Sequence, residues 1–132
     1  MDNKGQFDSS IPIFQQIVER MLNDIAAGTL APGDKVPAVR QLAAEYKVNP
    51  NTMQKSLEKL GDMGFLYTER TSGRFVTKDA AKIETLRRDI PARITAAYVE
   101  EMAASGIVAD EIPAYVEFFL KERKGNGKNT GN

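Results

Sequence analysis

The fold is decided by residues 37–57, which read PAVRQLAAEYKVNPNTMQKSL. Apolar side chains recur in this segment at steps of three and four residues, the period of an amphipathic helix, and the pattern breaks only around Val48. Pro37 is expected as the first residue of one helix, and Asn49-Pro50 as the cap and first residue of the next. The sequence therefore predicts two short helices joined by a tight turn, a helix-turn-helix.

The neighbouring segments supply the remaining parts of a winged helix-turn-helix. Apolar residues spaced for one helical face run over 13–25, and Gly28 is expected to end that helix. After the second short helix the pattern changes to that of strands, at 65–68 and 75–77, around a loop at 71–73. A lone hairpin is marginally stable in water, so we expect this one to pack against the helices.

The last third of the chain is expected to be helical. The pattern predicts a long helix over 80–105, which Pro91 should kink or split, and a short final helix capped by Asp110. The predicted fold class is mostly α with a small β-hairpin. Its parts are a flexible arm (1–10), a winged helix-turn-helix domain (11–78), a two-helix dimerisation region (79–124) and a disordered tail (125–132).

The composition excludes several kinds of chemistry. The 132 residues include no Cys and no His, which rules out disulfides, thiol nucleophiles, thiolate metal sites and histidine bases. The chain has no glycine-rich phosphate loop and no suggestive pair of acids, so we expect no enzyme activity, no metal site and no cofactor. The polar N-terminus and the lack of a long apolar stretch predict a cytoplasmic protein without a membrane partner.

The formal net charge is zero, from 18 basic and 18 acidic residues, but the charges are segregated. Residues 33–78 carry eight basic and five acidic side chains, a net of +3, which leaves −3 for the rest of the chain. This bias is modest for a protein that binds nucleic acid. We therefore expect affinity for DNA to come from individually placed contacts and from dimerisation.

The helix after the turn has the side chains of a DNA reader. The polar residues expected to be exposed in its first two turns are Asn49, Asn51, Thr52, Gln54, Lys55 and Ser56. Asparagine and glutamine amides pair with adenine, hydroxyls suit phosphates or bases, and lysine suits guanine or phosphate. No acid precedes Glu58 in this helix, and an acid-free face favours DNA.

A second interpretation stays open, a winged-helix module that binds protein without specific DNA binding. Taken singly, Arg40, Lys55 and Arg74 are ordinary surface cations, and Asn49-Pro50 is common turn chemistry. An apolar or acidic recognition face would favour a protein partner. The polar, acid-free face favours DNA, and the salt dependence of binding discriminates between the two interpretations.

Three stretches combine turn residues and helix starts at fixed spacings. They read PIFQQI at 12–17, IAAGTLAPGDKVPAVRQLA at 25–43 and VNPNTMQK at 48–55, followed by Leu60 and by GFL at 64–66. Over about residues 11–77 the chain resembles the DNA-binding domain of the GntR family of transcriptional regulators. The Asn-Pro-Asn-Thr form and the short C-terminal region are similar to the YtrA-type subgroup of that family.

The resemblance implies which side chains meet DNA. By position it implies Arg40, Asn49, Pro50, Asn51, Thr52 and Gln54, together with Ser72, Gly73 and Arg74 at the wing tip, which would enter the minor groove. Lys55 is added from its own chemistry. Many relatives carry arginine where this chain has Pro50 and Gln54, so the guanine readout of those relatives is not expected. A preference for A·T-rich half-sites, read by Asn51 and Gln54, is expected instead.

The two C-terminal helices are too small to enclose a core of their own, so their apolar stripe must be buried against another surface. A second copy is the simplest partner, which gives a C2 homodimer, and the resemblance implies the same role. The expected dimerisation residues are Ile83, Leu86, Ile90, Ile94, Tyr98, Met102, Val116, Phe119 and Leu120.

The expected function is that of a dimeric transcriptional regulator, most simply a repressor, on a two-fold double-stranded DNA operator. Tyr98, Tyr115, Phe118 and Phe119 are expected to form dimer core rather than an effector pocket. The sequence leaves open whether a small-molecule effector exists, and it identifies neither the operator nor the regulated genes. The YtrA-type resemblance implies transporter operons and self-regulation.

Overall fold

The structure is a computed structural model, and it describes residues 4–127. The chain divides into two compact units, with the boundary between Arg88 and Asp89. This boundary lies inside a helix, ten residues after the domain limit expected at residue 78. The domain limits drawn from the sequence stay predictions.

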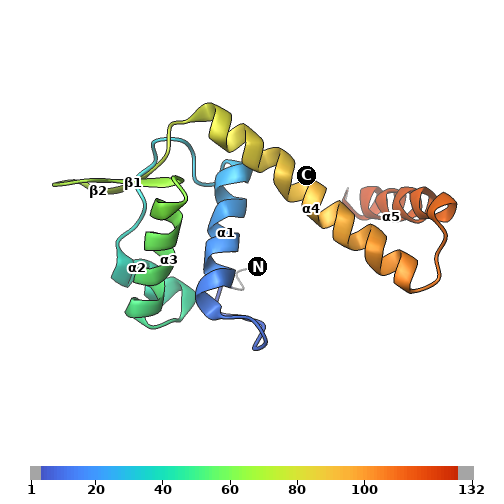
Figure 1. Ribbon diagram of the computed structural model, residues 1–132, viewed down its shortest axis with the longest axis horizontal. Helices are drawn as coiled ribbons and strands as arrows, with labels where there is room; N and C mark the ends of the chain where they lie inside the picture. The colour runs from blue at the N-terminus through green and yellow to red at the C-terminus, as the bar shows by residue number, and fades with distance from the viewer. Residues whose placement is uncertain (1–3, 128–132) are drawn as a thin grey trace. The chain divides into compact units, whose positions relative to one another are not determined.

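Between residues 4 and 88, the first unit contains three complete helices, a hairpin and the start of the long helix that leads into the second unit (Figure 1). Its elements are α1 (Ile13–Ala27), α2 (Val39–Tyr46), α3 (Pro50–Asp62), β1 (Leu66–Glu69) and β2 (Gly73–Val76). The helix α3 packs against both α1 and α2, and β1 follows it directly into the antiparallel hairpin. The predicted fold class, mostly helical with a two-stranded sheet, is confirmed.

One continuous core joins these elements. Ile17 from α1, together with Met53 and Leu60 from α3, is completely shielded from solvent. The buried apolar residues of the core are Ile17, Val18, Met21, Ile25, Val36, Leu42, Ala43, Tyr46, Met53, Leu57, Leu60, Phe65, Leu66, Val76 and Ile83. The helical and strand periods read from the sequence account for nearly all of these positions. The exception is Ile83. It lies after residue 78, where the winged domain was predicted to end, but its side chain belongs to the core of that domain.

Two helix starts differ from expectation. The prediction that Pro37 begins α2 is wrong, because Ala38 caps this helix with extended backbone angles and Val39 is its first residue. The chain before Pro37 is held extended, since the Val36 amide donates to the Arg74 carbonyl at 2.9 Å. A proline also favours extended backbone in the residue that precedes it.

The start of α1 differs as well. Pro12 occupies the cap position, without a side-chain hydrogen bond. Ser10, which could have capped this helix, instead donates its hydroxyl to the Asp8 carboxylate at 2.7 Å. The end of the helix is as expected, because Gly28 adopts the left-handed conformation there.

The wing gains a third segment from the chain that precedes α2. In the hairpin, Leu66 pairs with Val76 and Tyr67 with Phe75. Lys35 forms a further antiparallel bridge to Phe75 on the other side of β2. The Val76 amide donates to the Asp34 carbonyl at 2.9 Å, and β2 is thus the middle of three hydrogen-bonded segments.

The described part of the N-terminal arm contacts α1 and α2. The Lys4 ammonium lies 3.0 Å from a carboxylate oxygen of Glu45 and 5.3 Å from the centroid of the Tyr46 ring. Arg20 donates to the carbonyl oxygen of Lys4 at 2.8 Å, and its guanidinium lies 4.4 Å from the centroid of the Phe7 ring. These contacts connect residues 4–7 to the helix-turn-helix.

The second unit is helical. The helix α4 (Ala80–Ala104) starts in the first unit and ends in the second, and it continues through Pro91, so the expected split does not occur. Pro91 is exposed, and the carbonyl that its ring deprives of a partner belongs to Arg87, on an exposed turn that water can reach.

A short 3-10 turn, Ala109–Glu111, then leads into α5 (Ile112–Gly127). Val108 caps the turn, and Asp110 lies inside it, so the expected capping role of Asp110 is wrong. The last helix has 16 residues and is longer than predicted, since it includes residues 125–127 of the expected disordered tail. The rest of that tail lies outside the described residues.

Candidate nucleic-acid interface

The turn between α2 and α3 sets the start of the recognition helix. Lys47 adopts the left-handed conformation, with φ of 56°, and its amide donates back to the Ala44 carbonyl. Asn49 then caps α3, because its side-chain oxygen accepts from the Asn51 amide at 2.7 Å, and Pro50 occupies the first helical position. Cap and turn match the prediction from the sequence.

The side of α3 opposite the core carries the predicted polar side chains. Asn49, Asn51 and Lys55 are exposed, and Thr52 and Gln54 are half-buried. The buried side of the helix carries Met53, Ser56, Leu57 and Leu60. The structure therefore gathers the predicted recognition residues on one accessible side of one helix, next to its capped N-terminus.

Ser56 does not belong to this polar side, and its expected exposure is wrong. It is completely buried, and its hydroxyl donates to the carbonyl oxygens of Thr52, at 2.9 Å, and Phe14, at 3.3 Å. Ser56 follows Met53 by three residues and precedes Leu60 by four, so it lies on the core stripe of α3. Its hydroxyl joins α3 to the first turn of α1.

The first turn of α1 also contacts a side chain of the recognition helix. The Lys55 ammonium lies 4.1 Å from the centroid of the half-buried Phe14 ring. A cation over an aromatic face is attracted by the ring quadrupole, so this contact restrains a long and otherwise mobile side chain. Phe14, which the periodicity of the sequence marked only as core, thus contacts a residue of the candidate interface.

Gln54 has a partner on the same helix. Its amide nitrogen donates to a carboxylate oxygen of Glu58 at 2.9 Å, one helical turn further along. The sequence marks Glu58 only as the first acid of this helix, whereas the structure connects it to a predicted reading residue.

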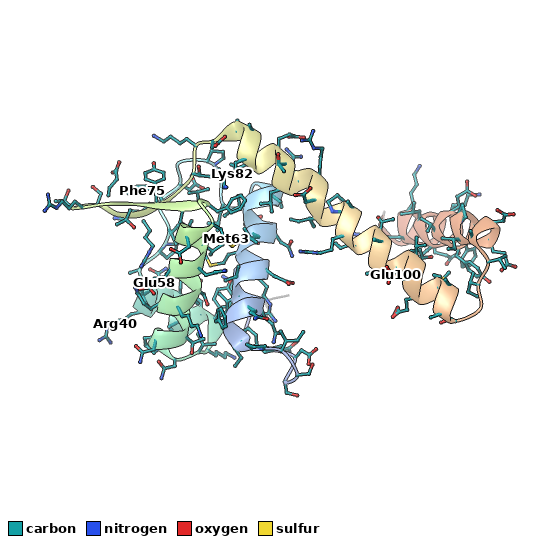
Figure 2. All side chains as sticks on the ribbon, in the orientation of Figure 1. Arg40, Glu58, Met63, Phe75, Lys82 and Glu100 are labelled. Atoms are coloured by element: carbon teal, nitrogen blue, oxygen red, sulfur yellow. The ribbon has the colours of Figure 1, made fainter. Side chains whose placement is uncertain are left out.

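Arg40 is exposed on α2, where its guanidinium is accessible to a ligand. Figure 2 shows Arg40 on α2 and Glu58 on α3 projecting to the same side of the first unit. No ion pair is found for Arg40 among residues 4–127. The arrangement is suited to a cation that contacts DNA beside the recognition helix.

The wing tip places small and basic residues at its exposed end. Ser72 and Gly73 are exposed, Gly73 has a φ of 109°, which favours glycine, and Arg74 is half-buried. Behind the tip, the rings of Tyr67 and Phe75 stack with centroids 5.7 Å apart. This cross-strand pair stiffens the hairpin that carries the tip.

Lys35 is a cation at the wing that the sequence did not single out. Its bridge to Phe75 aligns it with β2, and its side chain lies against Gly73, so that a Cβ added to Gly73 would be 3.4 Å from the Lys35 Cε. The two segments are far apart in the sequence, and only their pairing brings this charge to the wing. The only hint in the sequence was the Pro32-Gly33-Asp34 turn before Lys35, which reverses the chain just ahead of the segment that pairs with β2.

The predicted dimerisation residues fall into two groups. Ile83 is buried in the core of the first unit, and Leu86 packs against that core. In the second unit, Ile94 is exposed, whereas Ile90, Tyr98 and Met102 are half-buried. Val116, Phe119 and Leu120 are exposed on α5.

The second unit also contains an apolar groove of about 500 Å³. It is lined by residues of α4 and α5, namely Tyr98, Met102, Tyr115, Val116, Phe118, Phe119 and Leu120. Within the described chain, no group of three or more acids is placed to hold a metal ion. None of the helices between residues 4 and 127 has the length and apolarity needed to cross a membrane.

Comparison with known proteins identifies the family. Residues 13–76, the helix-turn-helix with its wing, match the family described as bacterial regulatory proteins, gntR family. A regulator named YhcF from Bacillus subtilis, described as an uncharacterized HTH-type transcriptional regulator, is 33% identical over 121 residues, which cover 92% of this chain and 98% of the relative. The chain belongs to the GntR family.

Two further relatives extend over most of the chain. The HTH-type transcriptional repressor YtrA of Bacillus subtilis is 28% identical over 127 residues, which cover 92% of this chain and 94% of that protein. The structure of a GntR family transcriptional regulator from Listeria monocytogenes is 39% identical and superimposes with a TM-score of 0.78, over 84% of this chain and 97% of that one. The predicted similarity to the YtrA-type subgroup is thus confirmed.

The family decides the general function. GntR proteins are DNA-binding transcriptional regulators and not enzymes, and this chain carries the winged helix-turn-helix of the family with an exposed polar recognition helix. The predicted regulator function and the absence of enzyme activity are confirmed at that level.

Proposed function

We propose that this protein is a homodimeric repressor that binds a two-fold DNA operator in a sequence-specific manner. The observation that carries the proposal is the accessible side of α3, where amide and ammonium side chains follow a capped helix start and no acid precedes Glu58. Such side chains bind base edges and phosphates, and the positive end of the helix dipole favours phosphate.

The proposed interface has three parts. The start of α3 enters the major groove, where Asn51 and Gln54 read bases. Arg40 and Lys55 bind phosphates on either side of that groove. The wing tip enters the neighbouring minor groove with Arg74, and Lys35 adds a positive charge behind it. This set extends the residues expected from the sequence by Lys35.

The support for a dimer comes from α5. Five of the six residues at 115–120 are apolar, so apolar side chains cover a wider part of the helix than one stripe. Phe118 and Phe119 keep 65% and 69% of their surface exposed. Contiguous apolar surface of this kind is unfavourable in water and marks an interaction site.

We propose a second copy as the occupant of the apolar groove in the second unit. Phe119 and Leu120 line the groove and are exposed, so the same residues of a second copy can fill the groove of the first in a two-fold arrangement. Ile83 and Leu86 are left out of this surface, because the core of the first unit already covers them.

Repression is proposed from the relatives, since YtrA of Bacillus subtilis is named a repressor. A dimer bound to its operator represses most simply by occupying the promoter. Such a protein works where the chromosome is, which in bacteria is the cytoplasm. Self-regulation makes the DNA upstream of the gene itself the first operator to test.

The experiment measures binding of the purified full chain to that upstream DNA and to a scrambled duplex, by gel shift over a series of salt concentrations. We expect two protomers per site and an affinity about 1,000-fold or more above that for the scrambled duplex. We also expect the affinity to fall steeply with salt. A reporter behind the same DNA should lose expression when the protein is produced.

The matched variant is Phe119→Glu, which places a charge in the groove of the second unit and leaves the proposed reading side chains of the first unit unchanged. It should be a monomer by light scattering and should bind one half-site weakly. Equal binding to both duplexes with little salt dependence would overturn the DNA proposal and favour a winged-helix module that binds protein. A dimeric Phe119→Glu variant would overturn the dimer surface alone.

A further inference from the structure

The hydrogen bond from Gln54 to Glu58 determines which end of the glutamine amide faces outward. A carboxylate only accepts hydrogen bonds, so the amide nitrogen must point toward Glu58, where it lies at 2.9 Å. The carbonyl oxygen of Gln54 then points away from Glu58 and is free to accept. A glutamine without such a partner rotates, and it presents its donor or its acceptor equally well.

We propose that Glu58 is a positioning residue that sets the base preference of Gln54. The inference rests on the proposed function, in which Gln54 reads a base edge. With its acceptor directed outward, Gln54 should select a base that offers a donor in the major groove. Adenine and cytosine offer such a donor, the amino group at N6 or N4, whereas guanine offers only acceptors and thymine an acceptor and a methyl group.

Adenine should be preferred over cytosine. The Gln54 amide nitrogen has two hydrogens, and only one is bound by Glu58. The second can donate to N7 of adenine while the carbonyl accepts from its N6, which completes a two-pronged contact. Cytosine offers only the single contact. Glu58 thus adds discrimination against guanine and thymine to the adenine preference of an asparagine- and glutamine-bearing helix.

The position of Glu58 supports this role over that of a solvated surface acid. Glu58 is exposed on a helix that approaches phosphates, where a negative charge weakens binding to any sequence. Within residues 4–127 its carboxylate has Gln54 as its partner and forms no ion pair. The presence of an acid at this place is therefore best explained by the hydrogen bond that it accepts.

The chain offers a matched control. On α2, the Gln41 amide donates to the Glu45 carboxylate at 3.2 Å, with the same spacing of four residues. Gln41→Ala removes a bond of the same kind from a helix that does not read bases. If the loss of a glutamine–glutamate hydrogen bond affects stability or DNA binding in general, Gln41→Ala should show the same effect as the Glu58 variants.

The experiment compares full-length wild type with Glu58→Ala, Glu58→Gln and Glu58→Asp. The probes are duplexes of the upstream DNA in which each half-site position carries each of the four bases in turn, and the readout is the ratio of affinities between bases. Wild type should prefer adenine to guanine or thymine at one position by about 10-fold or more. Circular dichroism checks that each variant is folded.

Glu58→Ala and Glu58→Gln should reduce that ratio to about threefold or less, because the Gln54 amide can then rotate. Glu58→Asp should restore it, since aspartate also bonds to a glutamine four residues away on a helix. Gln54→Ala should abolish the preference for adenine, so that the ratio of affinities falls to about 1. The double variant Gln54→Ala/Glu58→Ala should show the same ratio as Gln54→Ala alone. Overall affinity should rise when the negative charge is removed, so it is not the readout.

The inference is overturned if Glu58→Ala keeps the wild-type ratio while Gln54→Ala loses it, or if Glu58→Asp behaves like Glu58→Ala. It is also overturned if Gln41→Ala relaxes the ratio to the same extent. If wild type itself does not distinguish the upstream DNA from a scrambled duplex, the proposed function fails instead.

Discussion

The Lys55 ammonium lies 4.1 Å from the centroid of the Phe14 ring, so the first turn of α1 restrains a cation on the recognition helix. Replacing Phe14 by Leu should keep most of the packing but lose the attraction to the cation. We expect DNA affinity to fall about two- to fivefold, the equivalent of about 0.5–1 kcal/mol. Lys55→Gln should weaken binding more and should lower the slope of log affinity against log salt by about 1.

Lys82→Gln provides the control for this prediction. The Lys82 ammonium lies 4.8 Å from the centroid of the Phe65 ring. Phe65 follows the C-terminal end of α3, so this variant loses one charge and one contact of the same kind at the opposite end of the helix from its capped start. Its salt slope should stay that of the wild type. If Phe14→Leu weakens binding equally in the presence and absence of Lys55→Gln, Phe14 does not act through Lys55.

Asn49 has an observed role as a helix cap and a proposed role at DNA, and a single pair of variants separates the two. Asn49→Ala removes the side chain that accepts from the Asn51 amide, and it should lower the free energy of unfolding by about 1 kcal/mol. Asn49→Asp keeps the cap but places a negative charge against phosphate, so it should retain stability and lose DNA affinity. Urea unfolding and gel shift measure the two effects. Equal DNA affinity for Asn49→Asp and wild type would remove Asn49 from the interface.

Lys47 is the one described residue other than glycine with a positive φ, 56°. Side chains disfavour this conformation by about 1–2 kcal/mol relative to glycine. Lys47→Gly should therefore raise the free energy of unfolding. The net gain should be about 0.5–1 kcal/mol, because glycine also gives the unfolded chain more conformational freedom, which offsets part of the relief. Lys47→Ala keeps the strain while removing the charge, and urea unfolding should show no such gain. Stabilisation by both variants would point to the charge instead.

Ile83 determines where the chain can be shortened. A fragment that ends at Arg88 keeps Ile83 in the core, whereas one that ends at Lys78 loses it. We expect the shorter fragment to be less stable by about 2 kcal/mol or more, as for the loss of a buried isoleucine side chain. Both should be monomers by light scattering. Equal urea midpoints for the two fragments would show that Ile83 adds nothing to the first unit.

Burial raises the pKa of the Asp24 carboxyl, and the nearby Lys4 ammonium opposes this effect. The folded protein then binds the proton more tightly than the unfolded chain, so the stability linked to this group is present at low pH. It is lost as the pH rises from the unfolded value near 3.8 through the folded pKa.

Asp24→Asn should therefore raise stability at pH 7, by about 0.5 kcal/mol or less because the carboxyl is only partly buried. The gain should disappear as the pH falls below 4, where both forms are neutral. Thermal unfolding at several pH values measures the effect. A loss of stability at pH 7 would mean that attraction to Lys4 outweighs the cost of burial.

The fold of the first unit could be predicted because its signals are local. Asn49 and Pro50 mark the start of α3, Gly28 ends α1, and the helical period identifies Met53 and Leu60 as core. The same locality explains the failures. Whether Pro37 begins a helix depends on the pairing of Val36 with the wing, which is a contact between distant segments.

The candidate site was predicted in part for the same reason. Spacing along one helix was enough to assign Asn51, Gln54 and Lys55 to one face. It could not reveal that Phe14 contacts Lys55 or that Lys35 lies at the wing, because these residues come from other segments. Ser56 was misjudged because residue polarity suggested exposure, whereas the helical register places it on the core stripe.

The bonding of β2 on both of its sides affects how the wing would meet a groove in the proposed complex. A hairpin of two four-residue strands would fray by itself, and any ordering would have to take place on the DNA, at a cost in conformational entropy. Here the segment around Lys35 closes the second side of β2, with bonds from Val36 to Arg74 and from Val76 to Asp34. The wing arrives already shaped, so its tip can sample successive grooves during a search along DNA without refolding at each one.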